Sequence, residues 1–181
     1  MVAVHVGRVA AEKNLELVHR AFIAIRAQRP DARLVIVGSG PLLESFRGRP
    51  DVICPGTCQE ADLAAHYASG DLFLFASLTE TYGNVVAEAL ASGLPVVAFA
   101  YAAAARLLRA GVNGVPVPCG DEAAFISAAQ SLAGDDDLRR ACAGRAAASV
   151  ADLSWPAIGR CWIAHLRRCI AHHRERRTSC A

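Results

Sequence analysis

Lysine is almost missing from this 181-residue chain: Lys13 is the only lysine, whereas arginine occurs eighteen times. The skew is typical of a biased base composition in the coding DNA, and it draws attention to the one lysine that remains. Neither sign of charge is in excess, since the formal net charge is +2. Composition therefore provides no argument for an acidic partner, and we expect no nucleic acid to bind.

The spacing and number of the cysteines do not indicate pairs. The seven cysteines are odd in number, and no Cys-x-x-Cys pair occurs among them. They are scattered at Cys54, Cys58, Cys119, Cys142, Cys161, Cys169 and Cys180. The first residues do not have the pattern of a secretory signal. We therefore expect a cytoplasmic protein in a reducing environment.

No hydrophobic run is long enough to cross a bilayer. The longest uncharged stretch, 89–105, is shorter than the roughly 20 residues that a spanning helix needs, and it contains Gly93 and Pro95. We interpret this stretch as a buried strand and helix. Hydrophobic residues make up 54% of the chain, which is enough for the core of one domain and argues against disorder.

Strand-length apolar runs alternate with helix-like segments. Four strong runs lie at 2–6, 33–37, 71–76 and 95–100, and weaker strands are predicted at 52–53 and 115–117. Helices are predicted at 14–28, 41–46, 61–68 and 84–91, then throughout the region beyond Gly120, with a last helix at about 154–176. This alternation predicts an α/β fold over residues 1–181: one doubly wound, Rossmann-like parallel sheet of about six strands with a C-terminal helical tail.

Candidate ligand-binding residues follow the predicted strands. In such a sheet, ligands bind beyond the carboxyl ends of the strands, where loops lead into helices. Gly7, Arg8 and Lys13 follow the first strand, and Gly38 follows the second in the turn Gly-Ser-Gly-Pro. That turn lacks the third glycine and the downstream acid of the dinucleotide fingerprint, which disfavours a nicotinamide or flavin cofactor.

The stretch 77–97 contains two glutamates, Glu80 and Glu88, around a Tyr-Gly-Asn turn. A helix that begins near Asn84 would point the amides of residues 83–85 into the crevice, where the helix dipole favours a phosphate. Because carboxylates repel a phosphate, the two glutamates are better suited to accept hydrogen bonds from sugar hydroxyls. The alternative is that Glu80 only complements the dipole and that Glu88 is a solvated surface residue.

Arg8 and Lys13 supply the positive charge that a pyrophosphate in this crevice would need. The loop after the first strand can reach such a group from the side opposite the helix start. The two side chains would then stabilise the charge on a departing diphosphate without a metal ion. The alternative is a solvated loop in which Glu12 pairs with Lys13.

The C-terminal segment places Cys161, His165, Cys169 and either His172 or His173 about one turn apart, which could suggest a metal stripe. One rigid helix cannot converge four such ligands on a single ion, so no metal site is predicted. An amphipathic packing helix explains the pattern better. Its basic end could contact anionic lipid at a membrane surface, or could simply be solvated.

Taken together, these segments resemble the family-4 retaining glycosyltransferases, which have the GT-B architecture of two facing Rossmann-like domains. Four matches occur in the family's order and extend over nearly the whole chain. They are VGRVAAEKNLELVHRAF at 6–22, ARLVIVGSGP at 32–41, VICPGTCQEADLAAHYASGDLFLFAS at 52–77 and TETYGNVVAEALASGLPVVA at 79–98. The last match contains the family's signature of two glutamates separated by seven residues.

The resemblance implies a role for each matched position. It implies three catalytic residues: Arg8 and Lys13, which would bind the diphosphate, and Glu80, which would contact hydroxyls of the transferred sugar. It also implies that Glu88 binds the ribose and that the segment 55–57 lies beside the nucleobase. The full donor-binding set is Gly7, Gly38, Pro55, Gly56, Thr57, Tyr82, Gly83, Asn84, Val85 and Glu88.

The chain departs from the family pattern at 101–108. Many members have Gly-Gly-x-Pro-Glu before the last strand, whereas this chain has YAAAARLL, with Arg106 near the place of that glutamate. The surrounding sequence looks like a subgroup that includes GDP-mannose-dependent transferases acting on lipid or diacylglycerol-type acceptors. The expected substrate is therefore a nucleoside-diphosphate sugar, with GDP-mannose as the candidate, and no cofactor is expected.

The second departure is length. Met1 lies at the first strand of what resembles only the donor-binding half, so we expect the N-terminal acceptor domain to be absent from this chain and supplied in cis or in trans. The implied function is retaining transfer of a hexosyl group to an acceptor hydroxyl, by an enzyme that is incomplete without that half. The final helix would then expose an apolar face.

The sequence leaves three other functions open. The chain could be a non-catalytic module that binds a nucleotide sugar or docks to a partner chain, or it could be an inert remnant of a transferase. A sugar-nucleotide epimerase of similar architecture is the third alternative, but its acid-base histidines have no evident match here.

Overall fold

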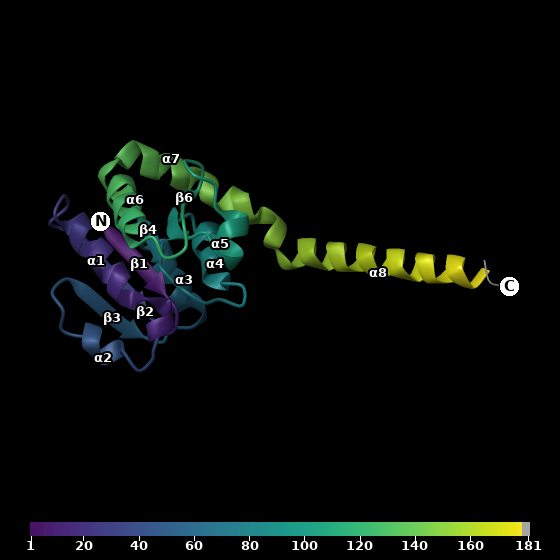
Figure 1. Ribbon diagram of the computed structural model, residues 1–181, viewed down its shortest axis with the longest axis horizontal. Coiled ribbons are helices and arrows are strands. Elements are labelled where there is room, and N and C mark those ends of the chain that lie inside the picture. Colours follow the sequence, from purple (N-terminus) through teal and green to yellow (C-terminus); the bar gives the residue numbers. More distant parts are fainter. Residues whose placement is uncertain (179–181) are drawn as a thin grey trace. The chain divides into compact units, whose positions relative to one another are not determined.

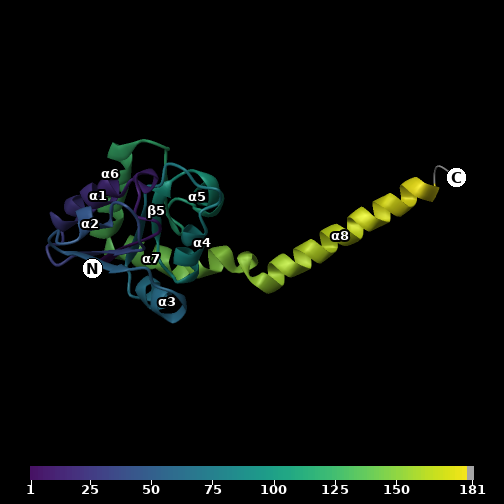
Figure 2. The same ribbon diagram turned by 90° about the horizontal axis from the view of Figure 1, so that it is seen from below.

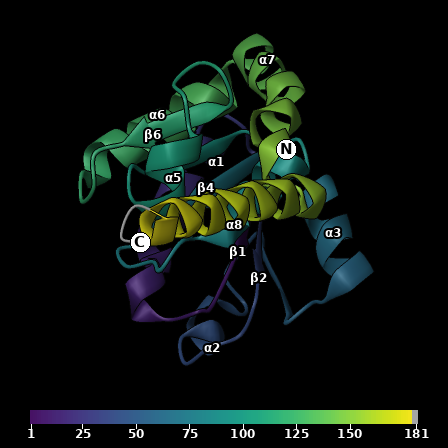
Figure 3. The same cartoon turned by 90° about the vertical axis from the view of Figure 1, so that its right-hand side faces the viewer.

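Six parallel strands form one sheet in the computed structural model, which describes the backbone of residues 1–178 and the side chains of residues 1–173. The order across the sheet is β3-β2-β1-β4-β5-β6. Figure 1 labels these strands except β5, and Figure 3 labels β2, β1 and β4 in that order. The strands are β1 (Val2–Val6), β2 (Arg33–Val37), β3 (Val52–Gly56), β4 (Leu72–Phe75), β5 (Val96–Phe99) and β6 (Gly114–Val117). This is the doubly wound α/β sheet that the sequence predicts.

The chain forms two compact units, residues 1–149 and the residues from Val150 on. Besides the sheet, the first unit contains η1 (Ala11–Lys13), α1 (Leu15–Arg26), α2 (Leu43–Phe46), α3 (Glu60–Ala68), α4 (Asn84–Ala91), α5 (Ala102–Leu107), α6 (Glu122–Gly134) and α7 (Asp136–Ala146). The short helix η2 (Ala147–Leu153) spans the boundary between the units, and α8 (Trp155–Thr178) belongs to the second.

The core lies between the sheet and its helices. On α1, apolar residues recur at helical spacing, and Val18, Phe22 and Ile25 are fully buried. Helix α1 lies beside α6 (Figures 1 and 2), whose Phe125 and Leu132 belong to the same buried cluster. Strands β4 and β5 are buried along their whole length, as expected for central strands of a parallel sheet that is covered on both faces.

The predicted strands are present, with changes at their ends. The runs at 2–6 and 33–37 coincide with β1 and β2, whereas 71–76 and 95–100 shorten to 72–75 and 96–99. The weak strand predicted at 52–53 extends to Gly56, so the segment expected beside a nucleobase is partly strand. Because β3 is an edge strand, it can include a proline, which has no amide to donate to a neighbouring strand.

Gly38 lets the loops after β1 and β2 stack backbone on backbone. Its φ is +141°, and a Cβ at this position would lie only 1.9 Å from the carbonyl oxygen of Gly7. The amide of Gly7 in turn donates a 3.0 Å hydrogen bond to the carbonyl oxygen of Val37. Only glycine fits this approach, so Gly38 positions the loop that leads to Arg8.

The second unit consists of the end of η2 and helix α8, whose bounds lie close to the predicted 154–176. Several large apolar side chains of α8 are exposed: Trp155, Trp162, Ile163, Leu166 and Ile170. Among the residues that the structure describes, no helix combines the length and the apolar character needed to cross a membrane. Six of the seven cysteines are free thiols, and Cys180 lies outside the described residues.

Gly38→Ala is expected to lower the free energy of unfolding by at least about 2 kcal/mol, because the atoms that it meets are backbone and cannot easily move. Gly144→Ala is the matched control. Gly144 lies in α7 with nothing within 4 Å of where its Cβ would be, so alanine there should raise stability by up to about 1 kcal/mol through helix propensity. Urea unfolding measures both, and equal stabilities would contradict the close approach.

Candidate functional site

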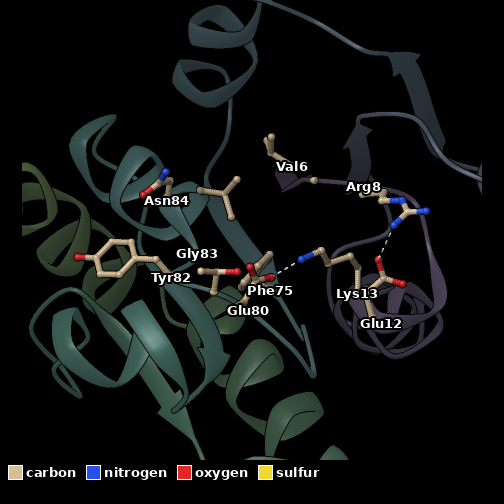
Figure 4. A pocket seen from close by; sticks show the side chains of 12 residues that line it. Val6, Arg8, Glu12, Lys13, Phe75, Glu80, Tyr82, Gly83 and Asn84 are labelled. Carbon is tan, nitrogen blue, oxygen red and sulfur yellow. Dashed lines mark hydrogen bonds and ion pairs between the residues drawn. The ribbon is translucent and has the colours of Figure 1, made fainter.

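A cavity of about 580 Å³ opens at the carboxyl ends of β1 and β4 (Figure 4). The two strands are neighbours in the sheet, but the chain continues from β1 to β2 on one side and from β4 to β5 on the other. Doubly wound sheets bind their ligands at such a reversal of strand order. The cavity is lined by Val6, Gly7, Arg8, Glu12, Lys13, Phe75, Glu80, Thr81, Tyr82, Gly83, Asn84 and Val85. Most of the predicted site residues are thus brought together.

Lys13 is held by Glu80 and not by Glu12. Its Nζ donates a 2.5 Å hydrogen bond to Glu80 Oε1, and the two side chains are only 17% and 14% exposed. The ammonium group also lies 5.9 Å from the centroid of the Phe75 ring. Glu12 instead forms a 3.4 Å ion pair with Arg8, whose side chain is 67% exposed (Figure 4). The alternative of a Glu12–Lys13 pair is therefore wrong, and each of these cations has its own carboxylate.

The start of α4 forms the wall opposite Lys13 (Figure 4). Gly83 precedes the helix with φ +92°, a left-handed conformation that glycine adopts without strain. Within the described part of the chain, no side chain caps this helix. The amide of Val86 donates a 3.1 Å hydrogen bond to the carbonyl oxygen of Gly83, so the amides of Asn84 and Val85 are the ones available to an anion, and the helix dipole favours negative charge at this end.

The loop between β4 and α4 is fastened on both sides. On one side, the amide of Leu78 donates a 2.9 Å hydrogen bond to the carbonyl oxygen of Glu12. On the other, the amide of Ala103 donates a 2.7 Å hydrogen bond to the carbonyl oxygen of Tyr82. These bonds connect the loop to the segment after β1 and to the start of α5, so the position of Glu80 is set by three separate parts of the chain.

Some predicted residues lie outside this cavity. Glu88 is exposed, and its carboxylate accepts a 2.8 Å hydrogen bond from the hydroxyl of Tyr67 on α3. Burial, helped by this bond, raises the pKa of Tyr67, so the hydroxyl keeps its proton and acts as the donor. Gly38 and the segment 55–57 lie at the adjoining ends of β2 and β3, where the Gly38 amide donates a 2.8 Å hydrogen bond to the carbonyl oxygen of Gly56.

His5 is a buried polar residue at the same end of β1 that the sequence analysis missed. Its ring stacks with those of Phe73 and Phe75, with centroids 6.4 and 5.8 Å away. Its Nδ1 lies 3.0 Å from the carbonyl oxygen of Leu74 and must donate to it, because a carbonyl oxygen only accepts. The paired residues of β1 and β4 end at Val4 and Phe73, so this side chain joins the two strands where their ladder stops.

The proton on Nδ1 leaves His5 Nε2 as a bare acceptor, and no hydrogen-bond partner for it occurs among the described residues. Burial lowers the pKa of His5 to about 4, which outweighs the opposite effect of the bond to Leu74. The ring is therefore neutral near pH 7. The signal in the sequence is one polar residue in an apolar strand, VAVHV at 2–6.

A family model described as "Glycosyl transferases group 1" matches residues 1–135, which include the whole sheet and every residue that lines the cavity. The chain belongs to this family. The resemblance predicted from the sequence is thereby confirmed. This group 1 glycosyltransferase chain matches solved structures of GT-B glycosyltransferases. Its fold corresponds to one half of the GT-B architecture.

The relatives of this group 1 glycosyltransferase chain are longer than the chain itself. The chain is 34% identical over 154 residues to a GDP-mannose-dependent alpha-mannosyltransferase of Corynebacterium glutamicum, a match to 84% of the chain and 36% of the relative. It is 45% identical over 101 residues to the sulfoquinovosyl transferase SQD2 of Arabidopsis thaliana, which covers 54% of the chain and 19% of the relative. Sucrose-phosphate synthase from Thermosynechococcus elongatus superposes with a TM-score of 0.78 and 26% identity, covering 94% of this chain and 46% of that one.

The C-terminal helix carries the cysteines and histidines of the stripe noted in the sequence. In the part of this group 1 glycosyltransferase chain that the structure describes, no group of three or more His, Cys, Asp or Glu residues is arranged to hold an ion. On α8, Cys169 Sγ lies 3.6 Å from His165 Nε2, so two residues of the stripe contact each other.

His5 is expected to lower the free energy of unfolding as the pH is decreased from about 6.5 to about 4. The folded-state pKa is lowered, so in this window the unfolded chain takes up a proton that the folded chain does not, and the loss reaches roughly 3 kcal/mol. His5→Phe should lose this part of the slope, because phenylalanine does not titrate. Urea unfolding at a series of pH values measures it.

His172→Phe is the control for the pH series, because it makes the same replacement at an exposed position on α8. A slope that is the same for His5→Phe and the wild type would show that His5 takes up its proton in the folded state as readily as in the unfolded state.

Proposed function

We propose that this chain is the donor-binding half of a retaining hexosyltransferase whose donor is a nucleoside-diphosphate sugar. One observation carries the proposal: Lys13 and the uncapped helix start at Gly83 line the same cavity. A cation from the loop after β1 and the amides of a helix after β4 are the two kinds of group that bind a diphosphate from opposite sides.

Binding of a diphosphate exchanges the partners of the Lys13 side chain. A phosphate oxygen replaces Glu80 as the acceptor from Nζ, since an anion of higher charge competes for the same donor. A deprotonated phosphate has no hydrogen to donate to the released carboxylate of Glu80, whereas hydroxyl groups donate to it readily. Glu80 is therefore assigned to hydroxyls of the sugar, next to the phosphate that carries it.

Lys13 and Arg8 also have a role in the transfer step. The bond between the sugar and the diphosphate breaks while the acceptor oxygen attacks from the same face, and negative charge develops on the departing diphosphate. Fixed cations and helix amides offset that charge most strongly where it develops. The Arg8 side chain is exposed, so it can break its ion pair with Glu12 and move to the departing diphosphate.

The nucleoside is assigned to the region around Glu88, beside the main cavity. Tyr67 donates to one carboxylate oxygen of Glu88 and so holds the group in place. The other oxygen can accept hydrogen bonds from the ribose hydroxyls. The segment 55–57 at the end of β3 then lies beside the nucleobase, and Gly38 supports that segment through Gly56.

GDP-mannose is the donor that we propose to test first. A relative that matches 84% of this chain at 34% identity is described as a GDP-mannose-dependent alpha-mannosyltransferase. The chain spans 36% of that relative's length, so the acceptor site is assigned to an N-terminal half supplied in cis or in trans. A cytosolic location, inferred from the unpaired cysteines, is part of the same proposal.

A non-catalytic binding module is the second candidate, and the exposed apolar side chains of α8 favour it, because such a face can serve as a docking surface. The two functions differ in what an added acceptor half does. Transfer of sugar when an N-terminal half from a relative is supplied supports the enzyme, whereas tight donor binding without transfer supports the module.

Lys13→Met is expected to weaken the binding of GDP or UDP roughly tenfold or more, because it removes a charge-assisted hydrogen bond but keeps a side chain of similar length over Phe75. Isothermal titration of the 181-residue chain measures this. Arg20→Met is the matched control: it removes a cation that forms an exposed ion pair with Glu122 away from the cavity. If both variants bind the nucleotides as the wild type does, the diphosphate site is wrong.

Glu88→Ala is expected to remove the preference of the protein for a ribose with free hydroxyls. The wild type should bind GDP at least about tenfold more tightly than 2′,3′-dideoxy-GDP, and the variant should bind the two nearly equally, because one lost hydrogen bond to a carboxylate already contributes about 1.5–3 kcal/mol. Titration of the four combinations forms a double-mutant cycle. A preference that survives in Glu88→Ala would place the ribose elsewhere.

A further inference from the structure

A second hollow, of about 400 Å³, adjoins the main cavity at the Lys13–Glu80 pair. The residues that line both spaces are Glu12, Lys13, Glu80 and Thr81. Thr79 and Tyr101 line only the second. The ion pair therefore stands at the junction of two spaces, one that contains the helix start and one whose walls are hydroxyls, carboxylates and a single aromatic ring.

Tyr101 is carried by a backbone that is held in place. It is the second residue after β5, and its amide donates a 2.7 Å hydrogen bond to the carbonyl oxygen of Phe99. The next residue, Ala102, has φ +47°, a left-handed conformation that is unfavourable for alanine and persists only where the surroundings hold it. The bond from Ala103 to Tyr82 provides such a hold. The ring of Tyr101 is thus presented from a fixed point.

The ring of Tyr101 is not part of the core, since the residue is 45% exposed. An aromatic ring at the edge of a polar hollow offers a surface to the apolar face of a ligand. The carboxylates and threonine hydroxyls around it bond to hydroxyl groups. A hexose has both kinds of surface, because its hydroxyls project around the ring while its C–H groups form apolar patches on the two faces.

We propose that Tyr101 is a specificity-determining residue, whose ring is the wall against which the sugar of the bound donor packs. The inference rests on the proposed function, since the diphosphate between Lys13 and Gly83 determines where the sugar can lie. From there the sugar extends past the Lys13–Glu80 pair into the second hollow. An axial hydroxyl interrupts the apolar face of a hexose, so the fit against Tyr101 distinguishes hexoses that differ at one carbon.

The test compares a nucleoside diphosphate with its sugar conjugate on the full 181-residue chain. Calorimetry gives the dissociation constants of GDP and GDP-mannose, and of UDP and UDP-glucose. Within each pair, the constant of the nucleoside diphosphate divided by that of its sugar conjugate isolates the contribution of the sugar. For the pair that binds, we expect Tyr101→Ala to reduce this ratio about fivefold or more. Tyr101→Phe keeps the ring and should stay within about twofold of the wild type. The constant for the nucleoside diphosphate should be unchanged in both.

Val112→Ala is the matched control, because it shortens another exposed apolar side chain, at a position that lines neither space, and should not alter the ratio. Thermal unfolding checks that each variant is folded. If Tyr101→Ala does not fold, Tyr101→Leu, which keeps the bulk without the ring, takes its place with the same expected loss.

Two results would overturn the role of Tyr101 and leave the proposed function intact: a ratio that is unchanged without the aromatic ring, or a ratio near one in the wild type. Failure of the wild type to bind either nucleoside diphosphate is a different result, and it would overturn the proposed function itself.

Discussion

The Lys13–Glu80 ion pair is the interaction on which the candidate site depends. It joins side chains 67 positions apart in the chain at 2.5 Å, and both are largely buried. Removing one partner of such a pair leaves the other charge without compensation, which is strongly unfavourable. The pair therefore holds the loop after β1 against the loop after β4 in the absence of a ligand. An anion that takes over the lysine can use the same geometry, and the glutamate is then left free for hydroxyl groups.

Backbone contacts keep this pair in register. Gly38 packs against Gly7 without a Cβ between them, and the loop that carries Glu80 is bonded to Glu12 on one side and to Ala103 on the other. These contacts do not involve the charged groups themselves. The site is consequently preorganised by the sheet and its loops, and a ligand does not have to order the loops when it binds.

Charge is balanced locally at this end of the sheet. Arg8 and Lys13 each have a carboxylate partner, while burial keeps His5 neutral beside them. A protonated histidine in that position would add a buried positive charge, and no residue that the structure describes offers an acceptor to its Nε2. The neutral ring instead joins β1 to β4 through Leu74, at the place where the two strands separate to make room for the cavity.

The sequence by itself determined the fold class, most strand positions and the edge of the sheet where the candidate residues gather, because apolar periodicity reports burial and because the carboxyl ends of parallel strands meet at one edge. Only the tertiary structure decided which groups these polar side chains contact. Lys13 pairs with Glu80, Tyr67 with Glu88 and His5 with Leu74, across 67, 21 and 69 positions respectively. The contacts of Lys13 and His5 depend on β1 lying beside β4, and a local pattern does not contain the order of strands in a sheet. A nearby partner such as Glu12 is therefore the natural but wrong prediction for Lys13.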